Sequence, residues 1–200
     1  MSFEFDEEEF ERDVKIKVVG VGGGGGNAVE NMVRNNVEGV DFIIVNTDVA
    51  ALKAKDGSAM ERVQIGRKTT KGRGAGGKPP VAAESAKENS DDIEEALNGA
   101  SLVFVAAGMG GGTGTGAAPV IAEIAKKKGI LTVGVVTKPF EFEREYKMNL
   151  ALQGIAELRK YVDALIIVPN QKLLSIKEKN ISIKAAYAMV DNVLYQAVKG

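Results

Sequence analysis

Two glycine-rich segments contain the residues whose types and spacing could do chemistry. The first runs from Gly20 to Asn27, and the second reads Gly-Met-Gly-Gly-Gly-Thr-Gly-Thr-Gly from Gly108 to Gly116. Because glycine has no Cβ, phosphate oxygens can approach bare backbone amides, and the dipole of a following helix favours the same anions. Thr113 and Thr115 add hydroxyl groups suited to a phosphate-bound Mg²⁺ ion. Two such loops indicate a polyphosphate, which favours a nucleoside triphosphate as ligand.

Two other phosphate-binding patterns have to be weighed against this interpretation. Gly20, Gly22 and Gly25 satisfy the G-x-G-x-x-G pattern and Asp48 follows the next apolar run, so an NAD-dependent oxidoreductase is an alternative. A dinucleotide fold uses one such loop, however, and this chain has two. The segment Gly72 to Pro79 resembles a Walker A loop but fails at Pro79, which supplies neither a hydroxyl nor an amide. Its cationic residues would instead suit a loop that covers the outer phosphate.

Composition excludes several kinds of chemistry. The chain has 200 residues, a net charge of -1, and neither Cys nor His, which removes disulfides, thiolate or imidazole metal sites and a Ser-His-Asp triad. The chain has no apolar run long enough to predict membrane insertion, and it has no uniformly basic face that would predict nucleic-acid binding. We therefore expect a cytoplasmic protein. Residues 1–13 carry seven acids and one base and are expected to form a mobile acidic tail. Residues 14–200 are long enough for one globular domain.

Apolar runs alternate with helical segments along residues 14–200. Most of the runs are nearly continuous, which is typical of strands in a parallel sheet covered on both faces. This order predicts an α/β fold, a Rossmann-like, doubly wound, mostly parallel sheet with helices on both faces, in which the loops after the strands bind ligands. A last helix is expected over 183–199. The other expected strands are 14–19, 40–45, 101–107, 130–137 and 164–168, and the other expected helices are 28–36, 81–97, 117–128 and 146–161.

Five segments in this order resemble the tubulin/FtsZ family from about Val14 to Gly200. They read GVGGGGGNAV from Gly20, VNTD from Val45, GMGGGTGTGAAPV from Gly108, VVTKPFEFE from Val135 and VPN from Val168. The resemblance implies a GTPase domain of a protein that assembles head to tail into filaments of the bacterial division ring at midcell. It also implies that GTP or GDP is bound with Mg²⁺ and that residues 183–199 belong to a long central helix.

The resemblance assigns residues to each part of the nucleotide. Gly23 to Asn27 would hold the α- and β-phosphates, and Asn27 would also approach the base. Gly112, Thr113 and Gly114 would hold the β- and γ-phosphates. Glu143 would bind the ribose, Tyr187 would stack on the base, and Asp191 would accept hydrogen bonds from guanine N1 and N2, which is the reason for preferring GTP over ATP. The full set of expected GTP-binding residues is Gly22, Gly23, Gly24, Gly25, Gly26, Asn27, Ala75, Gly76, Gly77, Gly108, Gly110, Gly111, Gly112, Thr113, Gly114, Thr115, Pro139, Glu143, Lys147, Asn170, Tyr187 and Asp191.

The chain departs from the family pattern at two places. Ala75-Gly76-Gly77-Lys78 stands where the family usually has Ala-Gly-Ala-Asn, and Lys147 replaces an arginine, keeping the charge but losing the bidentate fork. Phosphate affinity is expected to survive both changes.

No catalytic residue is expected within residues 1–200. In the family, an acidic loop after the central helix activates hydrolysis in the next subunit, and this loop would follow Gly200, as would a second domain and the parts that bind membrane-anchoring and division proteins. A regulatory GTP-binding module that neither polymerises nor hydrolyses GTP remains an alternative function.

Overall fold

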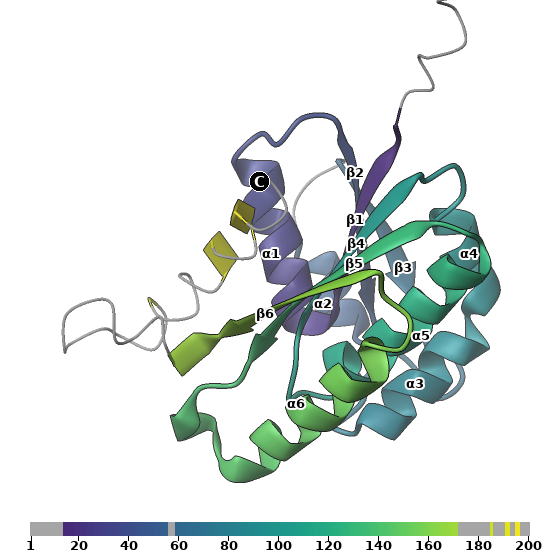
Figure 1. Ribbon diagram of the computed structural model, residues 1–200. Coiled ribbons are helices and arrows are strands. Elements are labelled where there is room, and N and C mark those ends of the chain that lie inside the picture. The colour runs from purple at the N-terminus through teal and green to yellow at the C-terminus, as the bar shows by residue number, and fades with distance from the viewer. Residues whose placement is uncertain (1–13, 56–58, 172–184, 186–190, 193–194, 197–200) are drawn as a thin grey trace, which may run out of the picture.

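The structure is a computed structural model that describes residues 14–55, 59–171, 185, 191–192 and 195–196. Six parallel strands form one sheet in the order β3-β2-β1-β4-β5-β6 (Figure 1). This order places the reversal of the winding between β1 and β4, where open α/β sheets bind ligands. The strands are β1 (Ile16–Val21), β2 (Val40–Asn46), β3 (Met60–Gln64), β4 (Leu102–Gly108), β5 (Leu131–Lys138) and β6 (Ala164–Pro169).

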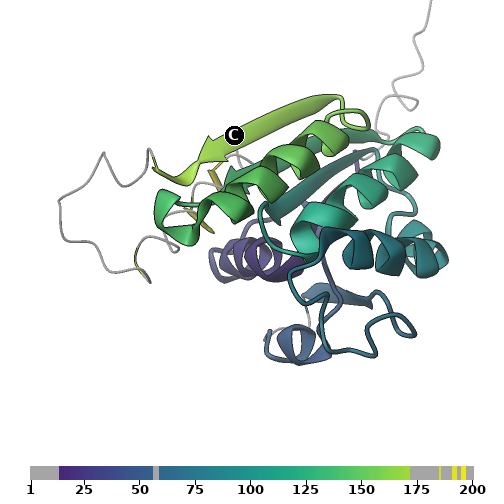
Figure 2. The ribbon, with the colours of Figure 1, turned by 90° about the horizontal axis from the view of Figure 1, so that it is seen from below.

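Helices cover both faces of the sheet, as Figures 1 and 2 show. Helix α1 packs against β1, β2 and β4 on one face, and α3 to α6 lie on the other, where α5 packs against β4 and β5. The short α2 follows β2. The helices are α1 (Gly22–Arg34), α2 (Val49–Lys53), α3 (Pro79–Glu88), α4 (Ser90–Ala96), α5 (Thr113–Lys127) and α6 (Glu145–Leu158), with a 3₁₀ helix η2 (Glu141–Glu143) before α6.

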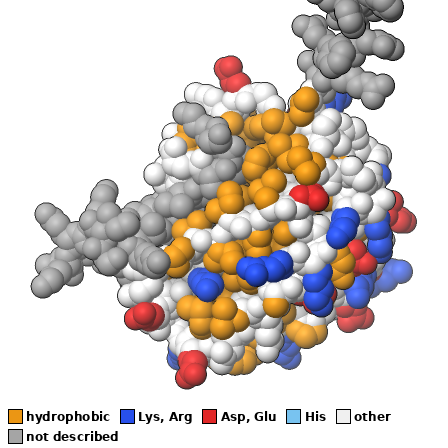
Figure 3. All heavy atoms as spheres, viewed as in Figure 1, with side chains coloured by type: hydrophobic (Ala, Val, Ile, Leu, Met, Phe, Trp, Pro, Cys, Tyr) orange, Lys and Arg blue, Asp and Glu red, His pale blue; other side chains and the backbone are white. Residues whose placement is uncertain are grey.

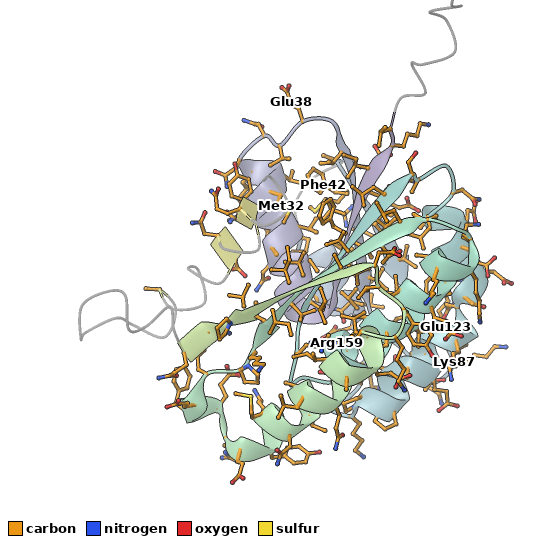
Figure 4. All side chains as sticks on the ribbon, in the orientation of Figure 1. Met32, Glu38, Phe42, Lys87, Glu123 and Arg159 are labelled. Atoms are coloured by element: carbon orange, nitrogen blue, oxygen red, sulfur yellow. The ribbon has the colours of Figure 1, made fainter. Side chains whose placement is uncertain are left out.

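Each face of the sheet has its own apolar core. On the α1 side, Met32 and Phe42, both labelled in Figure 4, belong to a buried cluster with Val18, Ile44 and Tyr195. The opposite core is larger and includes the fully buried Ile121 of α5. Strands β1 and β4 contribute to both cores because successive side chains point to opposite faces. This explains why their sequences are continuous apolar runs rather than alternating ones.

The α1 face is only partly covered by the described residues near β5 and β6. Figure 3 shows hydrophobic side chains along a diagonal band on this side of the molecule. Phe104 and Val133 are partly buried against the α1-side core, and Ile166 of β6 is exposed. Among the described helices, none is long and apolar enough to cross a bilayer.

The predicted α/β sheet is confirmed, and it is wholly rather than mostly parallel. Strand β3 and helix α2 were not predicted: β3 lies at the sheet edge and contains Glu61 and Arg62, so it lacks the apolar run of an inner strand. The single helix expected over 81–97 is two helices. Asn89 separates them, with its side-chain oxygen accepting a hydrogen bond from Gly66 N at 2.8 Å.

Two helices begin earlier than predicted, inside the glycine loops. Helix α1 begins at Gly22 rather than Ala28, and α5 begins at Thr113 rather than Ala117. The glycines therefore form the first helical turns themselves. Most of the expected helix over 183–199 lies outside the described residues; those that are described there, Ala185, Asp191, Asn192, Tyr195 and Gln196, are helical.

The packing of α1 across the sheet predicts unequal effects for two neighbouring glycines. A Cβ added at Gly25 would lie 2.2 Å from Ala106 O of β4, whereas one added at Gly23 would have no neighbour within 4 Å. Without nucleotide, Gly25→Ala should lower the free energy of unfolding by about 1–3 kcal/mol, because α1 must move away from the sheet. Gly23→Ala should change it by less than about 0.5 kcal/mol. Urea unfolding of both variants checks this, and equal effects would contradict the described packing.

Candidate nucleotide site

The two glycine loops meet at the carboxyl edge of neighbouring strands. β1 and β4 pair in parallel with Val21 opposite Ala107, so the loops that follow them emerge side by side. A Cβ added at Gly22 would lie 2.9 Å from Gly114 N, and one added at Gly24 would lie 3.3 Å from Gly108 N. Gly22 also has a φ of +71°, which favours glycine. Backbone therefore packs on backbone here, and a side chain at Gly22 would separate the loops.

Two helix N-termini open at this junction. The N-cap residues of α1 and α5, Val21 and Gly112, supply no side-chain acceptor to the first turn of either helix. The first-turn amides are therefore available to an external acceptor, and both helix dipoles favour an anion. The two termini together can bind more than one phosphate group.

The two threonines of the second loop have different surroundings. Thr113 Oγ1 lies 2.8 Å from Thr47 Oγ1, at the end of β2, and is partly exposed. Thr115 is buried and its hydroxyl accepts a hydrogen bond from Gly110 N at 2.9 Å. Thr113 therefore offers a hydroxyl at the open side of the junction, whereas Thr115 holds the loop in shape. Thr47 was not among the predicted site residues, although it lies in the VNTD segment.

A third glycine-rich loop, residues 72–78, packs against the second one. A Cβ added at Gly112 would lie 2.9 Å from Lys78 N, so this loop contacts the second glycine loop through backbone atoms. It is also tied to β2, because Gly74 N donates to Thr47 O at 3.1 Å. Ala75 is buried, whereas Gly76 and Gly77 are exposed and have positive φ values. Its exposed tip suits a loop that covers an outer phosphate.

Asp48 has a structural role in this arrangement. Its Oδ1 accepts hydrogen bonds from Ala50 N at 2.8 Å and Ala51 N at 3.2 Å, which caps α2. The backbone of Asp48 also forms an isolated antiparallel β-bridge with that of Arg73. In the dinucleotide alternative Asp48 would bind a ribose, but here its carboxylate stabilises a helix N-terminus.

Glu143 and Lys147 lie beside the second loop, on η2 and α6. Glu143 Oε1 accepts a hydrogen bond from Phe140 N at 3.0 Å, and its Oε2 pairs with Lys147 Nζ at 3.2 Å. A Cβ added at Gly110 would lie 2.6 Å from Pro139 Cγ and 2.8 Å from Lys147 O. Pro139 and the first turn of α6 therefore support the second glycine loop, and Lys147 of that turn pairs with the Glu143 carboxylate.

A cavity of about 160 Å³ lies at the first glycine loop, between the start of α1 and the residues that follow β2. Asn27 and Lys55 line it, and the Lys55 ammonium donates hydrogen bonds to Asn27 Oδ1 and Glu30 Oε2. Asp191 interacts electrostatically with both Lys55 and Glu30. Burial raises the pKa of Asp191 from an ordinary 3.8 to about 6, while Lys55 lowers it and Glu30 raises it. Asp191 therefore lies at the same end of the site as Asn27, because both are close to Lys55.

Of two other residues expected in the site, the structure describes Asn170 but not Tyr187. Asn170 is buried, and its Oδ1 has no hydrogen-bond partner among the described residues, so it has unused capacity for a polar ligand. Tyr187, the expected stacking residue, lies outside the described residues.

A larger hollow of about 600 Å³ lies elsewhere, between α3, α5 and α6. Lys87 and Glu123, labelled in Figure 4, belong to its lining. Its lining reaches Thr115 and Gly116 of the second loop but includes no residue of the first. It is therefore a groove on the helical face that reaches the second loop and Lys78 of the third loop but not the first loop.

Comparison with known proteins places this geometry in a family. The family model for the GTPase domain of the Tubulin/FtsZ family matches residues 15–178. The chain belongs to the tubulin/FtsZ family. The glycine loops, residues 72–78 and Glu143 all fall within the matched region, whereas Asp191 lies beyond it.

Relatives within the tubulin/FtsZ family are close in sequence. The cell division protein FtsZ of Buchnera aphidicola subsp. Acyrthosiphon pisum is 55% identical over 174 residues, covering 87% of this chain and 45% of that protein. FtsZ of Pseudomonas aeruginosa is 56% identical, covering 87% and 44%. The chain thus spans about half the length of the curated relatives it matches.

Solved structures in the tubulin/FtsZ family share the fold. The empty FtsZ dimer of M. jannaschii has a TM-score of 0.89 and 43% identity, over 94% of this chain and 54% of that one. A GTPγS-bound protofilament of CetZ2 from Haloferax volcanii has a TM-score of 0.80 and 25% identity, over 92% and 57%.

The surroundings of Asp191 predict a pH-dependent effect on stability. Because its folded-state pKa is raised above 3.8, the stabilisation by its proton is complete below that pH and is lost as pH rises through about 6. Without nucleotide, Asp191→Asn should therefore raise the free energy of unfolding at pH 7.5 by about 1 kcal/mol. This is less than the full pKa shift implies, because water screens the partly exposed side chain. The increase should be smaller at pH 4.5. Urea unfolding at both pH values measures this.

The control for this measurement is Asp41→Asn, because Asp41 is exposed on β2. It should have a small effect at either pH. A stabilisation by Asp191→Asn that is the same at pH 4.5 and pH 7.5 would contradict the assignment of a desolvated carboxylate to this position.

Proposed function

We propose that this chain binds GTP or GDP between its glycine loops, as the nucleotide-binding part of a GTPase that assembles head to tail into filaments for cell division. The contact between Gly22 and Gly114 is the observation that carries this proposal. It joins two helix N-termini at the point where the winding of the sheet reverses. A single phosphate would need only one of these termini, so the paired arrangement favours a polyphosphate.

Each part of the nucleotide has a counterpart among the described residues. The first-turn amides of α1 from Gly22 to Gly24 and the amides of Gly112 to Gly114 would bind the phosphates, with the tip at Gly76 and Gly77 over the outermost one. The Glu143 carboxylate would bind ribose hydroxyls. Asp191 would accept hydrogen bonds from guanine N1 and N2, and adenine does not present donors in that arrangement.

The donor set fits Mg²⁺ held mainly by the nucleotide. Among the described residues, no group of three or more carboxylates could hold a metal ion alone. Mg²⁺ commonly keeps several waters and binds substrate phosphates, and the Thr113 hydroxyl is the protein oxygen best placed to join them. When bound, the ion would neutralise charge that develops on the phosphates.

The names of the relatives support a filament with a role in cell division. FtsZ from two bacteria is a cell division protein, and CetZ2 forms a protofilament with a GTP analogue bound. We propose the same head-to-tail assembly here, with hydrolysis activated by an acidic loop of the adjacent subunit, at the midcell division site in the cytoplasm. The oxidoreductase alternative is disfavoured because Asp48 caps α2 and because a second glycine loop occupies the site.

The nucleotide preference is tested by calorimetric titration of the chain with GTP, ATP and NAD in the presence of Mg²⁺. GTP should bind at least about tenfold more tightly than ATP, since losing matched hydrogen bonds to a charged group costs about 1.5–3 kcal/mol. NAD should not compete. Thr113→Arg should abolish GTP binding by filling the junction, and Thr113→Ser, which keeps the hydroxyl, should retain it. Equal affinity for ATP would refute guanine selection, and unchanged binding by Thr113→Arg would refute the site.

A further inference from the structure

The cavity at the first glycine loop contains a lysine that the family pattern does not assign. Lys55 follows α2, 28 residues after Asn27 in the chain, yet its ammonium donates to Asn27 Oδ1. It also donates to Glu30 Oε2 at 2.7 Å. A Cβ added at Gly26 would lie 3.8 Å from Lys55 Cε, so the lysine stem crosses the first turns of α1. Lys55 thus connects the segment after β2 to the glycine loop.

The ion pair between Lys55 and Glu30 is largely shielded from water. Both side chains are only 16% exposed. Glu30 Oε1 is occupied by Arg34 at 2.8 Å, so Lys55 and Arg34 each bind one oxygen of the same carboxylate. Shielded pairs are more strongly coupled than exposed ones, and Lys55 is therefore held in a defined position.

The position of Lys55 determines which end of the Asn27 amide is available to a ligand. An ammonium group only donates hydrogen bonds, so it must face the amide oxygen and not the amide nitrogen. The two N–H donors of Asn27 are consequently directed away from Lys55. A ligand in the cavity would meet these donors, and its own matching groups would have to be acceptors, such as the ring nitrogen or carbonyl oxygen of a purine.

Lys55 also balances the charge of this end of the site. Glu30 and Asp191 are both acidic and repel one another, and Lys55 is the cation that acts on Asp191. Without it, the Asp191 carboxylate would lie beside a second carboxylate in a partly desolvated place. An ionised Asp191 is what a guanine donor pair requires.

We propose that Lys55 is a positioning residue for the purine end of the nucleotide: it fixes the Asn27 amide with its donors free and keeps Asp191 charged. This inference rests on the proposed binding of guanine nucleotides. It assigns Lys55 no contact with phosphate and no part in hydrolysis. Base recognition then depends on a contact between the glycine loop and the segment that follows α2.

The test compares Lys55→Met and Lys55→Gln with Lys55→Arg, by calorimetric titration with GTP and with inorganic tripolyphosphate, which lacks a base. The first two variants should weaken GTP binding about tenfold at pH 7.5, because they remove a charge-assisted hydrogen bond that orients the base partner. Tripolyphosphate affinity should not change. Lys55→Arg should restore most of the GTP affinity. The matched control is Lys53→Met, because Lys53 is exposed on α2 and should bind GTP like the parent chain.

A second measurement separates positioning from general stabilisation. GTP affinity is followed from pH 5.5 to 8.5, with circular dichroism at each pH to establish that the variants are folded. Asp191 faces Lys55 and Glu30, and Arg34 binds the far oxygen of Glu30. Removing Lys55 should therefore move the acidic loss of GTP affinity to higher pH. At pH 8.5, Lys55→Met should weaken GTP binding less in a chain that already carries Asn27→Ala than in the parent chain. The reason is that part of the effect of Lys55 on GTP binding passes through Asn27.

The outcomes distinguish this inference from the proposed function. If the parent chain binds tripolyphosphate but shows no preference for GTP, the proposed function fails. If the parent chain prefers GTP and both neutral variants bind it equally well with the same pH profile, the role of Lys55 fails alone. A parallel loss of tripolyphosphate and GTP affinity would likewise overturn it, because a positioning residue for the base leaves phosphate binding intact.

Discussion

The direct backbone contact between the two glycine loops is the constraint on which the rest of the site depends. β1 and β4 are neighbours in a parallel sheet, so the chain turns into α1 and α5 at the same edge. The two helices can begin so close together only because Gly22 and Gly114 have no side chains. The third loop then closes on Gly112 and is held by β2 through Thr47. Three segments that are far apart in sequence thereby surround one place where amides are available to an anion.

The two ends of the site use different physical chemistry. The phosphate end is built from backbone amides and helix dipoles, which recognise negative charge but carry no information about a base. The other end is built from charged and amide side chains, Asn27, Glu30, Lys55 and Asp191, in partly desolvated surroundings. We therefore propose that selectivity among nucleotides depends on the second end. Substitutions in the loops should weaken the binding of all nucleotides alike. Substitutions in the side-chain cluster should change the preference among nucleotides.

Much of the fold could be predicted from sequence because the inner strands and their loops carry strong local signals. Continuous apolar runs identified β1, β2, β4, β5 and β6, and glycine content identified the loops. β3 was not predicted because Glu61 and Arg62 interrupt its apolar pattern at an edge of the sheet. The start of α1 was predicted too late because glycine is a poor helix former. The different roles of Thr113 and Thr115, and the approach of Lys55 to Asn27, depend on contacts between distant segments. No local spacing encodes them.

The most direct test of the central claim is a crystal structure of the chain with a slowly hydrolysed GTP analogue and Mg²⁺. The account predicts phosphate oxygens on amides of both the Gly22 to Gly24 and the Gly112 to Gly114 segments, with the base beside Asn27 and Asp191. Phosphates bound by only one loop, or a nucleotide seated in the groove between α3, α5 and α6, would contradict it.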